Sequence, residues 1–310
     1  MPLRRLRLPL LGVVLPVLLV NCALEPDEML PPNPPGHPMV YVTLGLAFLD
    51  AIYLLSADGQ ETNVTEFVGN DSWPSWSPTG NAIVFQSDRD KFGSSDIYII
   101  TGVGTANRNT TRITDDTLHQ DAQPAWSPLG NRIAFVSDRD SAGLDIYLRD
   151  PVLGDDTVAH RVRLTTDAEN SAQPAWSPAG DRIAFASDRT GFADIWVMDT
   201  LGGNLVNLTN DGPADLSPAW SPDGTKIAFH SNRDGNNFAI WVMNADGSDP
   251  VQITSSEPPC ELPHWTPDGQ RIAFDCDGDI WVVNADGTNR VRITRTGNQQ
   301  RIESRPRWRP

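Results

Sequence analysis

The sequence PAWSPLGNRIAFVSDRD occupies residues 124–140 and decides the fold, because close variants of it recur along the chain. The same order of residues stands at 174–190 as PAWSPAGDRIAFASDRT. The Pro-x-Trp part of this motif occurs six times, at Trp76, Trp126, Trp176, Trp220, Trp265 and Trp308. Successive tryptophans are 43 to 50 residues apart. Self-similarity at such a period indicates a repeat architecture.

Each repeat is built from pieces with the composition of short β-strands. The tryptophan is followed by an Ile-Ala-Phe triplet or a relative of it, then Ser-Asp-Arg, then Asp-Ile-Tyr or Asp-Ile-Trp. These pieces are rich in β-branched and aromatic residues and are bounded by Gly, Pro, Asp and Asn, which is typical of strands and turns. Four strands per repeat of about 45 residues predict the blades of a β-propeller. A parallel solenoid is the structural alternative, and the hairpin-like turns argue against it.

The two ends of the repeat region predict six blades and the way in which the ring closes. Residues 39–55 have the pattern of the second and third strands of a unit, and no tryptophan motif precedes them. The last unit, around Trp308, supplies a first strand and then stops. We therefore predict an all-β, six-bladed propeller over residues 39–310, closed by pairing of the C-terminal strand with the segment near Val40. Such closure removes exposed strand edges.

The segment before the repeats has the features of an export signal followed by a tether. Residues 1–21 combine three arginines with a short apolar run, as expected for a signal peptide. The signal ends Leu-Val-Asn-Cys, which resembles a bacterial lipobox, although Asn21 stands where a small residue is usual. Cys22 is therefore predicted to be lipidated, with simple secretion as the alternative. Residues 22–38 are proline-rich and predict an extended tether.

The repeats between Trp76 and Trp308 resemble the WD40-like β-propeller repeats of the TolB family. The resemblance covers essentially all of residues 39–310 and rests on the Pro-x-Trp-Ser-Pro and Ile-Ala-Phe patterns. It implies a propeller of the cell envelope that binds other proteins. TolB itself is a periplasmic propeller that recruits a peptidoglycan-associated lipoprotein. It also has an N-terminal α/β domain without a counterpart in this sequence, so we do not expect the Tol partner to carry over.

Composition and motifs favour a binding protein over an enzyme. The formal net charge of −16 argues against nucleic acid as a partner, because phosphate binding requires clustered Lys and Arg. The sequence contains no Gly-x-Ser-x-Gly, phosphate loop or dinucleotide fingerprint. We expect a monomeric, noncatalytic platform that binds an envelope protein or peptide, without a cofactor. A carbohydrate-active lyase or hydrolase is the alternative, and a tether without a dedicated ligand is a third hypothesis.

Acidic residues recur four or five positions before each tryptophan. They are Asp71, Asp121, Asp215, Glu261 and Glu303, with Ser171 in the remaining repeat. If the blades are equivalent, these residues enter the innermost strands and form an acidic rim at one mouth of the channel. Such a rim requires compensation by a cation, a basic peptide or the arginines near the C-terminus. The alternative is that the acids only cap turns.

Two cysteines are predicted to form a disulfide. Cys260 and Cys276 have the same midpoint as the turn Pro-Asp-Gly at 267–269, so they face each other in an antiparallel hairpin. An exported compartment is oxidising, which favours the bond. Two independent buried thiols are the alternative.

Metal sites compete with structural roles for the remaining polar residues. The Asp-Arg pairs at 88–89, 138–139 and 188–189 are expected to join neighbouring hairpins. Asp275, Asp277 and Asp279 suggest a calcium site, but tight turns also favour Asp. Three histidines depart from the repeat pattern: His119, His230 and His264. They lack metal-ligand spacing, so we expect ordinary packed or surface histidines rather than a metal centre.

Overall fold

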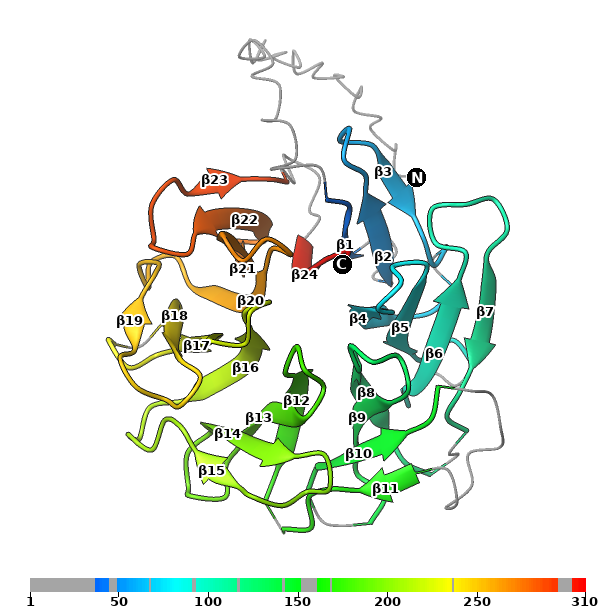
Figure 1. The fold of residues 1–310 in the computed structure, drawn as a ribbon. Helices are drawn as coiled ribbons and strands as arrows, with labels where there is room; N and C mark the ends of the chain where they lie inside the picture. The colour runs from blue at the N-terminus through cyan, green and yellow to red at the C-terminus, as the bar shows by residue number, and fades with distance from the viewer. Residues whose placement is uncertain are drawn as a thin grey trace, which may run out of the picture.

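The computed structural model describes residues 37–44, 49–66, 68–90, 93–115, 118–140, 143–151, 161–167, 169–235, 237–294 and 303–310. Within them the chain forms six four-stranded antiparallel sheets, arranged as the blades of a ring (Figure 1). The predicted signal peptide, Cys22 and most of the tether lie outside the described residues. A search of the described residues for a helix able to cross a membrane found none.

The first three blades contain the following strands. Blade I comprises β24 (Glu303–Trp308), β1 (Met39–Leu44), β2 (Asp50–Leu55) and β3 (Glu61–Asn63). Blade II comprises β4 (Asp71–Trp76), β5 (Ala82–Ser87), β6 (Asp96–Thr101) and β7 (Asn109–Arg112). Blade III comprises β8 (Asp121–Trp126), β9 (Ile133–Ser137), β10 (Asp145–Arg149) and β11 (Arg161–Arg163).

The other three blades repeat this order from the channel outwards. Blade IV comprises β12 (Ser171–Trp176), β13 (Arg182–Ser187), β14 (Asp194–Asp199) and β15 (Val206–Asn207). Blade V comprises β16 (Asp215–Trp220), β17 (Lys226–Ser231), β18 (Ala239–Asn244) and β19 (Val251–Gln252). Blade VI comprises β20 (Cys260–Trp265), β21 (Arg271–Cys276), β22 (Asp279–Asn284) and β23 (Val291–Arg292).

The ring closes through the last strand, as the sequence predicted. β24 lies beside β1 near the centre of the ring (Figure 1), and Val40 is the register partner of Arg307. The backbone N–H of Arg309 also donates to the carbonyl of Pro38 at 2.8 Å. The six-bladed all-β prediction is therefore confirmed, including the pairing that joins the two ends of the repeat region.

The core is made where neighbouring blades face each other. Trp76 of blade II packs with Val40 and Ile52 of blade I in one cluster, and Trp308 packs with Ile280 of blade VI in another. The phenylalanine of each Ile-x-Phe triplet is fully buried, at Phe85, Phe135, Phe185, Phe229 and Phe274. Since each aromatic side chain buries roughly 150–250 Å², these repeated residues dominate the packing between blades.

A threonine closes each blade by a hydrogen bond to its third strand. Thr114 Oγ1 accepts from the backbone N–H of Ile97 at 2.8 Å. The equivalent threonines are Thr65, Thr165, Thr209, Thr254 and Thr294. The hydroxyl satisfies a buried backbone donor where the short outer strand ends, which explains why threonine recurs at this point of the sequence.

Candidate binding site in the central channel

Each innermost strand carries a bulge shortly after its start. In blade III the pairing of β8 with β9 shifts between Ala122 and Ala125, and Gln123 has a φ of 52°. The corresponding residues of all six blades share this left-handed backbone: Trp73, Gln123, Gln173, Ser217, Leu262 and Arg305. None is glycine, so each position costs about 1–2 kcal/mol. Bulges bend a strand and redirect its side chains, here at the wall of the channel.

The bulges are linked from blade to blade by hydrogen bonds. The backbone N–H of Gln123 donates to Oε1 of Gln86 at 2.8 Å. Gln123 Oε1 in turn accepts from the N–H of Gln173, and Gln173 Oε1 accepts from the N–H of Ser217, both at 2.8 Å. These bonds occupy the amide oxygens, while no acceptor for Nε2 of Gln123 or Gln173 occurs in the described part of the chain. The amide N–H groups therefore remain available to a ligand in the channel.

The innermost strands enclose a cavity of about 510 Å³. Its wall contains all six repeat tryptophans and prolines from the Pro-x-Trp-Ser-Pro motifs, with polar groups from Gln123, Gln173 and Ser217. Of the residues that the structure describes, Arg307 of β24 is the one Asp, Glu, Lys or Arg side chain in this lining. Burial lowers the pKa of Arg307 to about 10, so the side chain stays charged at neutral pH. The cavity is thus aromatic and apolar, with a single cation.

Three of the predicted rim acids are buried ion-pair partners. Asp71, Asp121 and Asp215 are 0% exposed. Asp121 accepts from Arg139 Nη2 at 2.6 Å, and the equivalent pairs are Asp71 with Arg89 at 2.9 Å and Asp215 with Arg233 at 3.0 Å. The arginine of each Ser-Asp-Arg motif thus binds within its own blade. This placement corrects the predicted open rim: the acids join the first two strands of a blade. The side chain of Glu303 lies outside the described residues.

In blade VI two cysteines replace the aspartate and the serine that other blades have at this place. Cys260, five residues before Trp265, is the register partner of Cys276, and the two are joined by a disulfide. Asp71 and Ser87 are partners at the same place in blade II. Glu261 is therefore one position away from the other rim residues, which is the second correction to the predicted ring.

An arginine from elsewhere in blade VI fills the place left by the missing Ser-Asp-Arg motif. Arg290 stacks over Phe274 and Trp281, as Arg89 stacks over Phe85 and Tyr98 in blade II. Its Nη2 lies 2.9 Å from Cys276 Sγ. Aspartate five residues before the tryptophan thus accompanies the motif arginine in blades II, III and V, whereas Cys260 accompanies Arg290 in blade VI.

A second acidic group surrounds Arg305 at the seam of blades VI and I. Arg305 interacts electrostatically with Asp50, Glu261 and Asp275. Glu261 and Asp275 are register partners on β20 and β21. Burial, reinforced by the charge of Glu261, raises the pKa of Asp275 to about 7. Burial also raises the pKa of Glu261, and Arg305 opposes this rise. Glu261 thus stays near the channel, in a mixed cluster rather than a rim.

Comparison with known proteins identifies the family. The sequence profile described as the TolB beta propeller domain matches residues 32–150 and 150–277. The chain belongs to the TolB β-propeller family. A search of curated protein sequences found no match.

Solved structures show the same fold as this family member. TolB from Acinetobacter baumannii is 21% identical with a TM-score of 0.69, over 88% of this chain and 67% of that one. A putative TolB from Agrobacterium tumefaciens is also 21% identical, with a TM-score of 0.65 over 88% of this chain and 99% of that one. An oligogalacturonate lyase in complex with manganese is 17% identical, with a TM-score of 0.58 over 84% of this chain and 74% of that one. At these identities the likeness concerns the fold.

Two histidines of this TolB-family propeller act as hydrogen-bond acceptors within the protein. Nδ1 of His230 accepts from the backbone N–H of Leu262 at 3.2 Å, and burial lowers the pKa of His230 to about 3. Nδ1 of His264 accepts from the N–H of Trp308 at 3.5 Å, and burial also lowers its pKa to about 3. Among the described residues, no histidine belongs to a group of His, Cys, Asp and Glu side chains placed to share a metal ion. His119 is likewise outside any such group.

The three aspartates considered for a calcium site, at 275, 277 and 279, have different contacts. Asp279 pairs with Arg292, whereas Asp277 is exposed at the turn with a φ of 56°. Asp275 belongs to the cluster around Arg305. The three side chains therefore have different surroundings.

Asp275→Asn is expected to stabilise the protein at high pH and to have no effect at low pH. The folded-state pKa of Asp275 lies above its unfolded value, so the wild-type protein loses stability as pH rises from about 4 to 7 and keeps that loss above pH 7. The variant should therefore raise the free energy of unfolding by about 1–3 kcal/mol at pH 8 and by about 0 at pH 4. Urea unfolding at both pH values measures the difference. Asp181→Asn, at a 64% exposed side chain, is the control. An equal effect at both pH values would contradict the assignment.

Proposed function

We propose that this chain is a noncatalytic envelope protein whose channel cavity binds a segment of another protein. The observation that carries the proposal is the cavity of about 510 Å³ lined by the six repeat tryptophans, by Trp73 and by the flanking prolines. Ligand sites are typically concave, largely apolar and about 300–1,000 Å³ in volume. Among the described residues, the group of side chains placed to share a metal ion lies outside this lining.

The polar groups of the cavity match an extended peptide with an acidic group. The Nε2 groups of Gln123 and Gln173 can donate to backbone carbonyls, because their amide oxygens already accept from neighbouring blades. Arg307 supplies the positive charge for a carboxylate. Apolar side chains of the peptide would pack on the tryptophan and proline rings. The preferred partner is therefore an acidic or carboxylate-bearing segment with apolar residues, rather than the basic peptide that an acidic rim would have bound.

We propose the location of the protein from its first residues. Residues 1–21 as a signal peptide would direct export, and acylation of Cys22 would hold the propeller at a membrane through the segment 22–38. We propose that the propeller acts there as a monomer. Mass spectrometry of the mature N-terminus in membrane fractions tests the anchor.

Site-specific photocrosslinking in native envelopes tests the binding site. A benzophenone amino acid replaces Ala175, which lines the cavity, or Val251, which is 57% exposed on the outer strand β19. The proposal expects a discrete adduct from position 175 that is absent at position 251. Arg307→Gln in the Ala175 variant should reduce that adduct at least about tenfold, since it removes the cation of the cavity. Identical adducts at both positions, or no adduct at position 175, would exclude the cavity as the site.

A further inference from the structure

Three aspartates meet where blade IV packs against blade V. Asp194 begins β14, Asp215 begins β16, and Asp211 lies in the segment that joins the two blades. One carboxylate oxygen from each residue lies within 4.8 Å of the others. Over the described ranges of the chain, this is the one group of three or more His, Cys, Asp or Glu side chains with such geometry.

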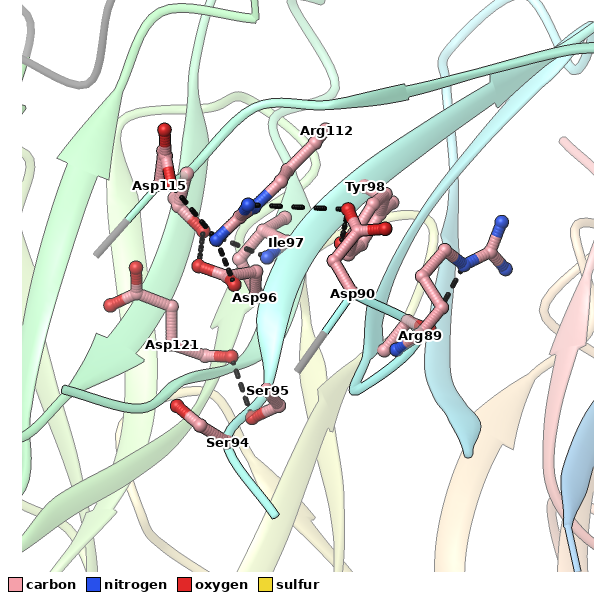
Figure 2. A network of polar contacts seen from close by, with 12 residues as sticks. Arg89, Asp90, Ser94, Ser95, Asp96, Ile97, Tyr98, Arg112, Asp115 and Asp121 are labelled. Atoms are coloured by element: carbon pink, nitrogen blue, oxygen red, sulfur yellow. Dashed lines mark hydrogen bonds and ion pairs between the residues drawn. The ribbon is translucent and has the colours of Figure 1, made fainter. Parts of the chain in front are cut away.

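An arginine occupies the corresponding place in blade II. Arg112 Nη2 lies 2.6 Å from Asp96 and 3.0 Å from Asp115 (Figure 2). Its Nη1 also lies 4.0 Å from Asp90, so three aspartates share its charge. Asp96 begins β6 as Asp194 begins β14. The same pairing recurs in two other blades, as Asp145 with Arg163 and Asp279 with Arg292. A buried aspartate at the start of the third strand is therefore normally neutralised by an arginine from the fourth.

Blade IV lacks this arginine. Asn207 of β15 is the register partner of Trp196, as Arg112 is of Tyr98 in blade II. Asn207 Nδ2 donates to Asp194 Oδ2 at 2.9 Å, but an amide brings no charge. Blade IV therefore has no positive charge at the place where blade II has Arg112.

The remaining charges do not balance at this junction. Arg233 contacts Asp211 at 3.2 Å and Asp215 at 3.0 Å, so one arginine serves a group of three aspartates. Asp194 is 2% exposed, and its Oδ1 has no hydrogen-bond partner among the described residues. A buried carboxylate oxygen without a partner is strongly unfavourable. The excess of negative charge and the unpartnered oxygen together favour a bound cation at this junction.

We propose that Asp194, Asp211 and Asp215 bind a calcium ion in place of the arginine that blades II, III and VI use. The donor set contains only carboxylate oxygens, which suit a hard cation. Calcium holds oxygen ligands at about 2.3–2.6 Å, so oxygens up to about 4.8 Å apart can share one ion. The side chain of Asp211 is 42% exposed and gives the ion access from solvent. The site is independent of the channel cavity and of the proposed function.

The ion would act as a clamp between two blades. Asp194 belongs to blade IV, and Asp215 to blade V, so coordination by both couples the blades as Arg112 couples Asp96 to Asp115 at the junction of blades II and III. Calcium bound only by the folded protein raises its thermal stability by mass action. The site thus predicts a stability that depends on calcium concentration.

The proposal is tested with CaCl₂ as the probe, on the full chain purified in EDTA and then dialysed. Calorimetric titration measures calcium binding, and thermal unfolding measures the change in Tm. The wild-type protein should bind one calcium ion saturably, and Tm should rise by about 5 °C at a concentration about 100 times the Kd. Asp194→Asn should weaken binding at least about tenfold. Asn207→Arg should abolish binding and raise Tm without calcium, because it restores the arginine that blades II, III and VI use. Asp234→Asn, which removes a nearby exposed charge, is the matched control and should bind like the wild type.

Three results would overturn the proposal. The first is the absence of saturable binding up to 10 mM CaCl₂, which is about ten times the weakest Kd expected for an extracellular calcium module. The second is unchanged binding in Asn207→Arg. The third is equal affinity for Mg²⁺, because magnesium needs ligands at about 2.0–2.1 Å and releases its water reluctantly. Folding of Asn207→Arg is checked by its own unfolding transition, and Asp211→Asn provides a second variant at an exposed ligand.

Discussion

A chain truncated after residue 302 is expected to lose the cooperative unfolding transition of the intact propeller. The truncation removes β24, which is the innermost strand of blade I and pairs with β1. It exposes the buried edge of β1 and removes Trp308, which is 2% exposed in the core between blades VI and I. Removal of one large buried aromatic side chain alone typically costs about 3–5 kcal/mol. Since whole domains are stable by only about 5–15 kcal/mol, loss of the complete strand should open the ring.

Circular dichroism during thermal unfolding and size-exclusion chromatography measure this effect. Trp308→Ala provides a graded version and should lower the free energy of unfolding by about 3–5 kcal/mol. Leu201→Ala is the matched control, because Leu201 is 87% exposed and its truncation should change the free energy by less than about 0.5 kcal/mol. A truncated chain that unfolds as sharply as the intact protein, at nearly the same Tm, would show that closure is not needed for stability.

The closure itself could be predicted because it depends on counting. The tryptophan motif marks the end of every innermost strand, so the incomplete units at the two ends must share one blade. The same counting placed Cys260 opposite Cys276, since partners in a hairpin have a common midpoint. Features determined by strand register and repeat number are therefore accessible from the sequence.

Burial of the acidic residues could not be read in the same way. Whether an aspartate at the start of an innermost strand faces solvent depends on a side chain 18 residues later, as for Asp121 and Arg139. The sequence nevertheless carried a signal. The arginine stands 13 residues after each of four tryptophans. In the repeat that has Cys260 in place of the aspartate, Gly278 stands at this position. Blade IV departs from this pattern, because Arg189 is kept where Ser171 replaces the aspartate.

The bulges and their hydrogen bonds left no comparable signal. Their left-handed residues include Gln123, Leu262 and Arg305, types that do not favour a positive φ. The strain is tolerated because the bulge N–H groups of blades III to VI find acceptors on the preceding blade. Such a conformation is imposed by tertiary structure, so local sequence cannot reveal it. The polar groups offered to a channel ligand were missed for the same reason.

Arg139→Ala is expected to lower the free energy of unfolding by about 3–5 kcal/mol, because it leaves a buried carboxylate without its counter-charge. The side chains of Arg139 and Asp121 are 2% and 0% exposed, and Nη2 of the arginine donates to both carboxylate oxygens. Its guanidinium also lies 5.5 Å from the ring centre of Tyr147. The cost therefore combines lost packing with the energy of an unpaired buried charge.

Blade IV provides the control that separates these two contributions. Arg189 occupies the same position and stacks over Trp196 at 4.7 Å, but Ser171 replaces the aspartate. Arg189→Ala should therefore cost only about 1–2 kcal/mol, from lost packing and from the partly exposed pair with Asp167. Urea unfolding of both variants measures the difference, and adding Asp121→Asn to Arg139→Ala should recover at least about 1 kcal/mol. Equal costs for the two arginines would mean that packing, and not the buried charge, gives the motif its importance.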